Sequence, residues 1–260
     1  MKILIALPDN NYFLWQMLVQ INNFKKFGLD SDVIYVIGKN SIQKSSILTD
    51  IMLKTNTKCN YYIFNDERNN PLYSPSLRPH ILAKFFETYP NAEKETFFYI
   101  DPDVILTKKF KLNDFEKDNF WYLSDTRSYI DSGYIKSKSE VLFQEMCGII
   151  GIAPCMVEEN DINAGGAQYV MKNVNSDFWK KVEIDCEELY KHMVNTSNKY
   201  NPEHPIQAWT ADMWAVLWNA WLYGHQTKIS EKLDFCWATD LAKKWKTTNI
   251  YHNAGAVIDN

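Results

Sequence analysis

The first hundred residues alternate between strand-like and helix-like segments, and this alternation restricts the possible folds more than any other feature. Residues 2–7 form a largely apolar run that ends at Pro8, as expected of a strand buried on both faces. Residues 12–27 carry apolar side chains at helical spacing and end at Gly28, a helix-stop signal. The alternation continues with strands predicted at 32–37, 61–64 and 97–100, and with helices predicted at 41–54 and 74–89. We therefore predict an α/β fold, with an open, mainly parallel sheet flanked by helices and ligands at the carboxyl ends of its strands.

The second half of the chain is less regular. Its pattern predicts helices at 176–193 and 206–223, and short strands at 121–124, 148–153, 162–170, 228–237 and 248–252. Residues 125–140, 154–161 and 195–205 are polar and are expected to be loops. No repeat, low-complexity tract or linker divides the sequence, so we expect one compact domain over residues 1–260.

Composition excludes several classes of protein. Of the 260 residues 46% are hydrophobic, which indicates a globular chain rather than a disordered one. The 28 basic and 32 acidic side chains give a net charge of −4, which does not favour sequence-independent nucleic-acid binding. The five cysteines form no CxxC pair, which indicates a reduced protein without a structural zinc site. With no apolar run of about 18 residues and no signal peptide, we expect a cytoplasmic protein without a membrane partner. The sequence leaves its oligomeric state open.

The most informative segment is FFYIDPDVIL, residues 97–106. Its predicted strand brings Asp101 and Asp103 to the edge of the sheet. Two carboxylates at such an edge can hold Mg²⁺ or Mn²⁺, and either ion would neutralise a diphosphate. The alternative is an acidic turn in which Asp101 caps the backbone and Asp103 faces water. The strand and the three preceding βα units favour the metal site.

Two further segments contain candidate ligand-binding residues. In NAGGAQ, Gly165 and Gly166 would let the backbone approach a sugar or phosphate, with Asn163 and Gln168 as hydrogen-bonding partners. A bulged strand would explain the paired glycines equally well. His252 lies in IYHNAG, residues 250–255, where it is either a structural residue or a metal ligand. An imidazole nitrogen beside two carboxylates would suit Mn²⁺ better than Mg²⁺.

A tryptophan-rich segment spans residues 208–221. Trp214, Trp218 and Trp221 share one face of the predicted helix and are expected to pack in the core. Trp209 and Asp212 lie at the start of this helix. They are either ligand-contacting residues or ordinary helix-start residues, since a carboxylate is favoured there by the helix dipole.

In their order along the chain, these segments resemble nucleotide-sugar glycosyltransferases with the GT-A fold. The resemblance implies that residues 1–106 bind the nucleotide sugar and that residues 107–260 bind the acceptor. It also implies a metal site of Asp101, Asp103 and His252, with Arg78 as a basic partner of the diphosphate. The first-strand end, with Leu7, Pro8 and Asn11, would then hold the nucleoside.

The same resemblance gives the remaining candidates their roles. Asn163, Gly165, Gly166, Gln168 and Asp212 would surround the transferred sugar and the acceptor, and Trp209 is a further candidate for contacting the ligand. Asp212 would be the general base of an inverting reaction or a sugar-hydroxyl ligand in a retaining one. The expected activity is transfer of a sugar from a nucleoside diphosphate sugar, expected to be UDP-linked, to an acceptor hydroxyl, with Mn²⁺ or Mg²⁺ as cofactor.

The middle and Trp-rich parts are also similar to hydroxyproline arabinosyltransferase-type sequences and their phage-encoded relatives. This similarity suggests a bacterial or phage-infected cell and a hydroxymethylated DNA base as one candidate acceptor. The net acidity counts against DNA, because backbone contacts need several basic side chains. The stretch 127–138, with Lys136 and Lys138 near Tyr129 and Tyr134, is either a local basic and aromatic surface or a solvated loop.

Two other functional classes remain open. Asp101-Pro-Asp103-Val-Ile also approximates the DxDx(T/V) motif of haloacid dehalogenase-type phosphohydrolases. Those enzymes carry the motif on their first strand, and this chain has no later GDxxxD. The third class is a non-catalytic nucleotide-sugar-binding module.

Overall fold

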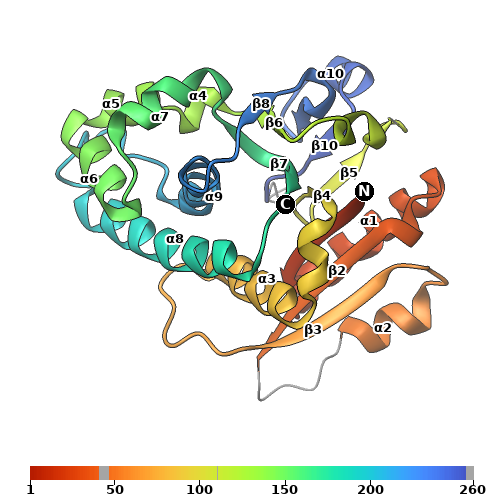
Figure 1. Ribbon diagram of the computed structural model, residues 1–260. Helices are drawn as coiled ribbons and strands as arrows, with labels where there is room; N and C mark the ends of the chain where they lie inside the picture. The colour runs from red at the N-terminus through yellow and green to blue at the C-terminus, as the bar shows by residue number, and fades with distance from the viewer. Residues whose placement is uncertain (41–46, 110, 256–260) are drawn as a thin grey trace.

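The computed structural model describes residues 1–40, 47–109 and 111–255, which are built around a seven-stranded sheet (Figure 1). The strand order is β3-β2-β1-β4-β7-β6-β8. The pairs β1–β2, β2–β3, β1–β4 and β6–β8 are parallel, and β7 is antiparallel to both β4 and β6. The strands of this sheet are β1 (Lys2–Pro8), β2 (Val33–Asn40), β3 (Asn60–Asp66), β4 (Thr96–Tyr99), β6 (Trp121–Asp125), β7 (Gly165–Lys172) and β8 (Thr227–Ile229).

Helices cover both faces of the sheet, because the strands present apolar side chains on both sides. On β1, Ile3, Ile5 and Leu7 pack into the core beneath α1 and α2, and Leu4 and Ala6 pack into the core beneath α3, α8 and α9. Figure 1 shows α3 and α8 side by side on one face. The helices are α1 (Asn11–Phe27), α2 (Ile47–Lys54), α3 (Leu77–Thr88), α4 (Arg127–Ile130), α5 (Ser132–Lys138), α6 (Glu140–Ile150), α7 (Pro154–Asn160), α8 (Ser176–Thr196), α9 (Ala211–Leu222) and α10 (Ala242–Thr247).

A second, three-stranded sheet has the order β5-β10-β9. Strand β5 (Val104–Leu106) begins directly after the Asp101–Asp103 turn, and β10 (Ile250–His252) pairs with it in antiparallel fashion. Strand β9 (Phe235–Trp237) pairs with β10 in parallel. This small sheet carries His252 back to the turn that follows β4.

The pattern of the first half is confirmed. Helix α1 ends at Gly28, whose φ of 70° is the left-handed conformation that glycine adopts without strain. Pro79 is the third residue of α3, where a missing backbone N–H costs no helical hydrogen bond. Of the helix predicted at 41–54, residues 41–46 lie outside the described residues and the rest contains α2.

The prediction of loops at 125–140 and 154–161 and of a strand at 148–153 is wrong, because these segments contain α4, α5, α6 and α7. Ser139 caps α6 by accepting hydrogen bonds from two backbone N–H groups, and Gly151 ends it with a φ of 79°. Ile149 and Ile150 are therefore in the last turn of a helix that is buried on one face. The strand predicted at 228–237 is two short strands separated by a turn at Glu231–Leu233. Within the described ranges, no single helix is long and apolar enough to cross a membrane, although the bent pair 140–150 and 154–163 reaches that length and composition together.

The tryptophan stripe of α9 is a core element, as predicted. Trp218 is fully buried and contacts Phe143 edge to face. We expect Trp218→Ala to lower the free energy of unfolding by about 3–5 kcal/mol, because it leaves a large cavity. Urea titration measures the change, with Trp15→Ala on the exposed face of α1 as the matched control, expected to cost about 0.5 kcal/mol or less. Equal losses in the two variants would contradict the core assignment.

Candidate metal centre and its surroundings

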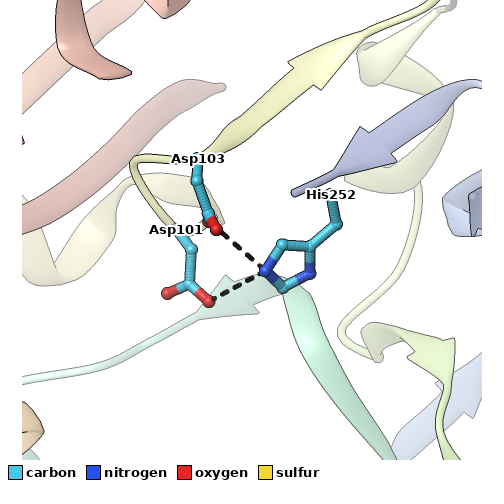
Figure 2. Close-up of side chains that lie close together, drawn as sticks. All are labelled: Asp101, Asp103 and His252. Carbon is cyan, nitrogen blue, oxygen red and sulfur yellow. Dashed lines mark ion pairs between the residues drawn. The ribbon is translucent and has the colours of Figure 1, made fainter. Parts of the chain in front are cut away.

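Three elements bring Asp101, Asp103 and His252 together (Figure 2). Their ligand atoms lie within 4.8 Å of one another. His252 Nε2 is 3.6 Å from Asp101 Oδ2 and 3.3 Å from Asp103 Oδ1. The two aspartates occupy the turn between β4 and β5, and His252 ends β10. This edge is the carboxyl end of β4, beside β1, where the strand order reverses and ligands of open α/β sheets bind.

The turn that carries the aspartates is fixed from behind by α1. The buried Gln20 side chain donates hydrogen bonds to the carbonyl oxygens of Asp101, at 2.9 Å, and Val104, at 2.8 Å. Its own oxygen accepts a hydrogen bond from the Tyr35 hydroxyl at 3.0 Å. Gln20 is not among the residues predicted from sequence, because a polar residue within an amphipathic helix carries no local signal of its partner.

The charges of the cluster depend on one another. Burial raises the pKa of Asp101, and neighbouring Asp103 acts in the same direction while Arg78 opposes it. Burial acts against ionisation of Asp103 as well, but the hydrogen bond and charge of His252 lower the pKa of Asp103. Although burial opposes its protonation, the same hydrogen bond and charges raise the pKa of His252. A proton on His252 therefore occupies the nitrogen that a metal ion would bind. Two carboxylate oxygens and one imidazole nitrogen are a set of ligands that suits Mn²⁺.

Cation binding at this cluster is therefore expected to depend on pH. His252 must lose its proton to bind a metal, and its pKa is raised above the ordinary value of 6.5. Below that raised pKa the affinity for Mn²⁺ should fall about tenfold for each pH unit, because a proton competes with the ion for one ligand. Calorimetric titration with MnCl₂ between pH 8.5 and 6 measures this slope. A constant affinity across the range would show that His252 is not a ligand.

Arg78 connects this cluster to the start of α9. Its guanidinium donates to Asp101 Oδ1 through one nitrogen and to Asp212 Oδ2 through the other. Asp212 Oδ1 accepts a hydrogen bond from the Tyr73 hydroxyl at 2.7 Å. Although its partial burial acts in the opposite direction, the two carboxylates raise the pKa of Arg78. Arg78, the predicted partner of a diphosphate, is thus paired with two carboxylates. Both carboxylate oxygens of Asp212, the predicted general base, already accept hydrogen bonds.

The two glycines of the NAGGAQ segment lie in β7 against other parts of the protein. A Cβ on Gly165 would come 2.5 Å from the carbonyl oxygen of Ser124, and one on Gly166 would come 2.6 Å from the Tyr169 hydroxyl. The pairing with β6 is irregular here, and Ala167 has a φ of 64°. The bulged-strand alternative thus accounts for both glycines. The carbonyl of Asn163 accepts a hydrogen bond from Thr227 Oγ1 at 3.1 Å.

The remaining candidates lie at different depths. The Leu7 side chain is fully buried in the core beneath α1, so only its backbone is available to a nucleoside. Pro8 ends β1, and the exposed Asn11 begins α1. Trp209 is 63% exposed, and its ring lies edge to face against Tyr73, the hydrogen-bonding partner of Asp212. It is therefore free to contact a ligand near Arg78.

A cavity of about 550 Å³ lies close to the Asp101–Asp103–His252 cluster. Its wall includes Trp237, whose ring centroid is 5.0 Å from that of His252. Trp237 is also absent from the residues predicted from sequence, because no motif marks a short strand as the neighbour of a distant histidine. Charged and aromatic side chains line the cavity, among them Asp125, Arg127, Tyr129, Asp234, Trp237 and Lys244.

No family model and no curated protein matches the sequence. Among solved structures, an active-site mutant of LgtC matches with a TM-score of 0.50 and 13% identity, over 98% of this chain and 88% of that chain. The galactosyltransferase LgtC with donor and acceptor sugar analogues gives 0.49 and 13%, over 98% and 87%. A glycosyltransferase involved in glycosylation of the major capsid of PBCV-1 gives 0.45 and 13%, over 99% and 95%. Together with the order of its central sheet, the first of these likenesses shows that the chain has the GT-A fold of glycosyltransferases.

Proposed function

We propose that this protein is a metal-dependent glycosyltransferase that moves a sugar from a nucleoside diphosphate sugar, expected to be UDP-linked, to an acceptor hydroxyl. The observation that carries the proposal is the convergence of Asp101, Asp103 and His252 at the carboxyl end of β4. Two carboxylate oxygens and one imidazole nitrogen leave positions on a Mn²⁺ ion for phosphate oxygens. When bound, the ion would stabilise negative charge on the leaving diphosphate.

The surrounding residues take roles that follow from their contacts. Arg78 holds Asp101 in place and keeps a positive charge beside the cluster. Asp212 anchors Arg78 from the other side and is proposed as a positioning residue, since its oxygens are engaged by Arg78 and Tyr73. Pro8, Asn11 and the backbone of Leu7 offer the nucleoside site at the end of β1. Trp209 provides an exposed ring for the sugar or the acceptor.

We place the acceptor in the cavity lined by Trp237 and Asp234, because an aromatic ring beside a carboxylate suits the apolar face and the hydroxyls of a carbohydrate. The basic and aromatic surface considered for DNA is engaged within the protein. Lys136 pairs with Glu158, and Lys138 lies 5.0 Å from the centre of the Tyr134 ring. A carbohydrate or other small hydroxyl compound is therefore favoured over hydroxymethylated DNA. The arabinosyltransferase and phage likenesses remain predictions from sequence.

The direct test is incubation of the purified protein with Mn²⁺ and a panel of UDP-sugars. Release of UDP from one donor is the expected result, and mass spectrometry of candidate sugars and of hydroxymethylated DNA then identifies the acceptor. Cleavage of a generic aryl phosphate without donor hydrolysis would favour the phosphohydrolase. Tight donor binding with neither hydrolysis nor transfer would favour the binding module.

A further inference from the structure

Helix α10 exposes apolar side chains at the periphery of the molecule, at the top of Figure 1. Leu241, the N-cap residue, is 84% exposed, the highest fraction among the large hydrophobic residues that the structure describes. Trp245 follows four residues later, so the two side chains lie on the same side of the helix, and it is 41% exposed. The Trp245 ring packs against Tyr251 at a centroid distance of 5.1 Å, which holds the indole in place while part of it faces water.

Exposed lysines lie next to this apolar pair. Three of them are on α10 itself, where every residue is exposed. The segment after β5 lies beside the helix and adds others, because Lys108 Nζ donates a hydrogen bond to the carbonyl oxygen of Thr247, the last residue of α10, at 3.2 Å. We define the α10 surface as Leu241, Trp245 and the exposed lysines of these two segments, which are Lys108, Lys109, Lys111, Lys243, Lys244 and Lys246.

Most of the positive charge of the α10 surface is not neutralised within the protein. Among the described residues, Lys244 pairs with Asp240 at 2.9 Å, and the other five lysines of the surface form no ion pair. Neither segment, 104–111 or 241–249, contains an acidic residue. This local excess runs against the net charge of −4 of the whole chain. Like charges that lie together at a surface attract an extended partner of opposite charge, so the α10 surface suits an anionic one.

The apolar pair distinguishes between two kinds of anionic partner. A nucleic acid offers phosphates to lysines and bases to aromatic rings, but it has no apolar layer for the Leu241 side chain. An anionic bilayer offers phosphates at its surface and hydrocarbon beneath them, and tryptophan is favoured at the boundary between the two. A short helix with Leu241 and Trp245 on one side and lysines around them therefore matches a bilayer surface.

We propose that the α10 surface docks on an anionic lipid bilayer, with Leu241 and Trp245 entering the interface and the six lysines contacting lipid phosphates. The expectation of no membrane partner rested on the lack of a long apolar run, which docking on a membrane surface does not require. The inference goes beyond the proposed sugar transfer and does not depend on it, because neither the donor nor a metal ion takes part in the docking.

Co-sedimentation of the full chain with vesicles tests the docking. The protein should bind vesicles of phosphatidylcholine with about 40% phosphatidylglycerol and should not bind vesicles of pure phosphatidylcholine. Raising NaCl from about 0.1 M to about 0.5 M should release it, because salt screens the attraction between lysines and lipid phosphates. Failure to bind the anionic vesicles, or equal binding to both kinds, would overturn the proposal.

Paired charge variants then locate the surface. Lys243→Gln combined with Lys246→Gln should lower the affinity for anionic vesicles about 10–30-fold, since each lysine near such a membrane contributes roughly a fivefold factor. Lys26→Gln combined with Lys94→Gln is the matched control, because it removes the same charge from two exposed lysines, one on α1 and one in the turn before β4. The control should bind as the wild-type protein does. Equal losses in the two double variants would mean that net charge, and not the α10 surface, decides binding.

The apolar pair is tested in the same way. Leu241→Ser should weaken vesicle binding about 5–10-fold, because the side chain no longer enters hydrocarbon, whereas Leu53→Ser, at a position on α2 that is 78% exposed, should not. Vesicles with brominated acyl chains should quench tryptophan fluorescence of the wild-type protein and of Trp15→Phe, in which another half-exposed ring is removed. The quenching should disappear in Trp245→Phe. Quenching that persists in this variant would place a different face on the bilayer and refute the role of α10.

A duplex oligonucleotide tests the other anionic partner. Binding of the duplex that requires Lys243 and Lys246, without binding to anionic vesicles, would assign the α10 surface to nucleic acid and overturn the proposal. The changed lysines and Leu241 are exposed, and thermal unfolding should show that their variants keep the wild-type stability. Vesicle binding by a protein that hydrolyses no donor would refute the glycosyltransferase proposal and leave this one standing.

Discussion

Exchanging Asp103 for Asn should lower the Mn²⁺-dependent release of UDP from a donor sugar by about 10²–10³-fold or more. The Asp103 carboxylate faces His252 Nε2 at 3.3 Å, so it supplies one of the two negative charges at the proposed cation site. An amide of the same shape offers a neutral oxygen, which binds a divalent cation far more weakly than a carboxylate does. The affinity for Mn²⁺, measured by calorimetry, should fall together with the rate of UDP release, measured by a coupled assay.

The control for Asp103→Asn is Asp114→Asn, which removes an aspartate paired with Lys117 and Lys232 on the surface. This variant should release UDP at the wild-type rate. Thermal unfolding of both variants separates loss of the ion from loss of the fold. Metal-dependent UDP release that survives in folded Asp103→Asn would exclude the proposed role of the cluster.

Replacing Arg78 with Met should lower the free energy of unfolding by about 2–4 kcal/mol. This is somewhat less than the loss of stability that follows when one partner of a fully buried ion pair is removed. Its guanidinium is the shared partner of Asp101 and Asp212, and its removal leaves two carboxylates without their main counter-charge. The side chain remains partly accessible to water, which is why the lower part of the range is included. Urea titration measures the loss, and donor hydrolysis should fall with it because Asp101 is no longer held.

Two comparisons make the Arg78 prediction specific. Lys180→Gln removes a surface ion pair with Glu87 and should cost about 1 kcal/mol or less. Combining Arg78→Met with Asp212→Asn should cost clearly less than the sum of the single changes, because the second change removes one of the stranded charges. If the two losses of unfolding free energy simply add in the double variant, the side chains of Arg78 and Asp212 do not stabilise the protein by interacting with each other.

Local patterns were sufficient for the first half of the fold, because each of its segments carries its own periodicity and its own stop signal. Pro8 and Gly28 end β1 and α1 as the sequence indicates. Between residues 125 and 160 the helices are short and partly polar, and their apolar positions match no single period clearly. Helix α6 packs against α8 and α9, α7 packs against α9, and α5 packs against α6, and only the folded chain shows these contacts.

The grouping of Asp101, Asp103 and His252 was predicted by resemblance, whereas the contacts around it were not. Asp101, Asp103 and His252 converge because β5 and β10 pair, and strand pairing across almost 150 residues leaves no trace in either strand. For the same reason the sequence does not show that Gln20 bonds to the turn or that Gln168 bonds to His252. Arg78 shows this limit most clearly. The resemblance predicts it as a partner of the diphosphate, whereas in the structure it pairs with two other candidate site residues, Asp101 and Asp212.

The pairing of β10 with β5 also means that the candidate metal centre is completed late in synthesis. During synthesis Asp101 and Asp103 leave the ribosome long before β10, so the two aspartates lack the histidine until residue 252 has been made. Closing so long a loop costs conformational entropy, which a bound cation would help to offset. A chain that ends before β10 would therefore carry Asp101 and Asp103 without His252, and we expect it to bind Mn²⁺ more weakly than the full chain does.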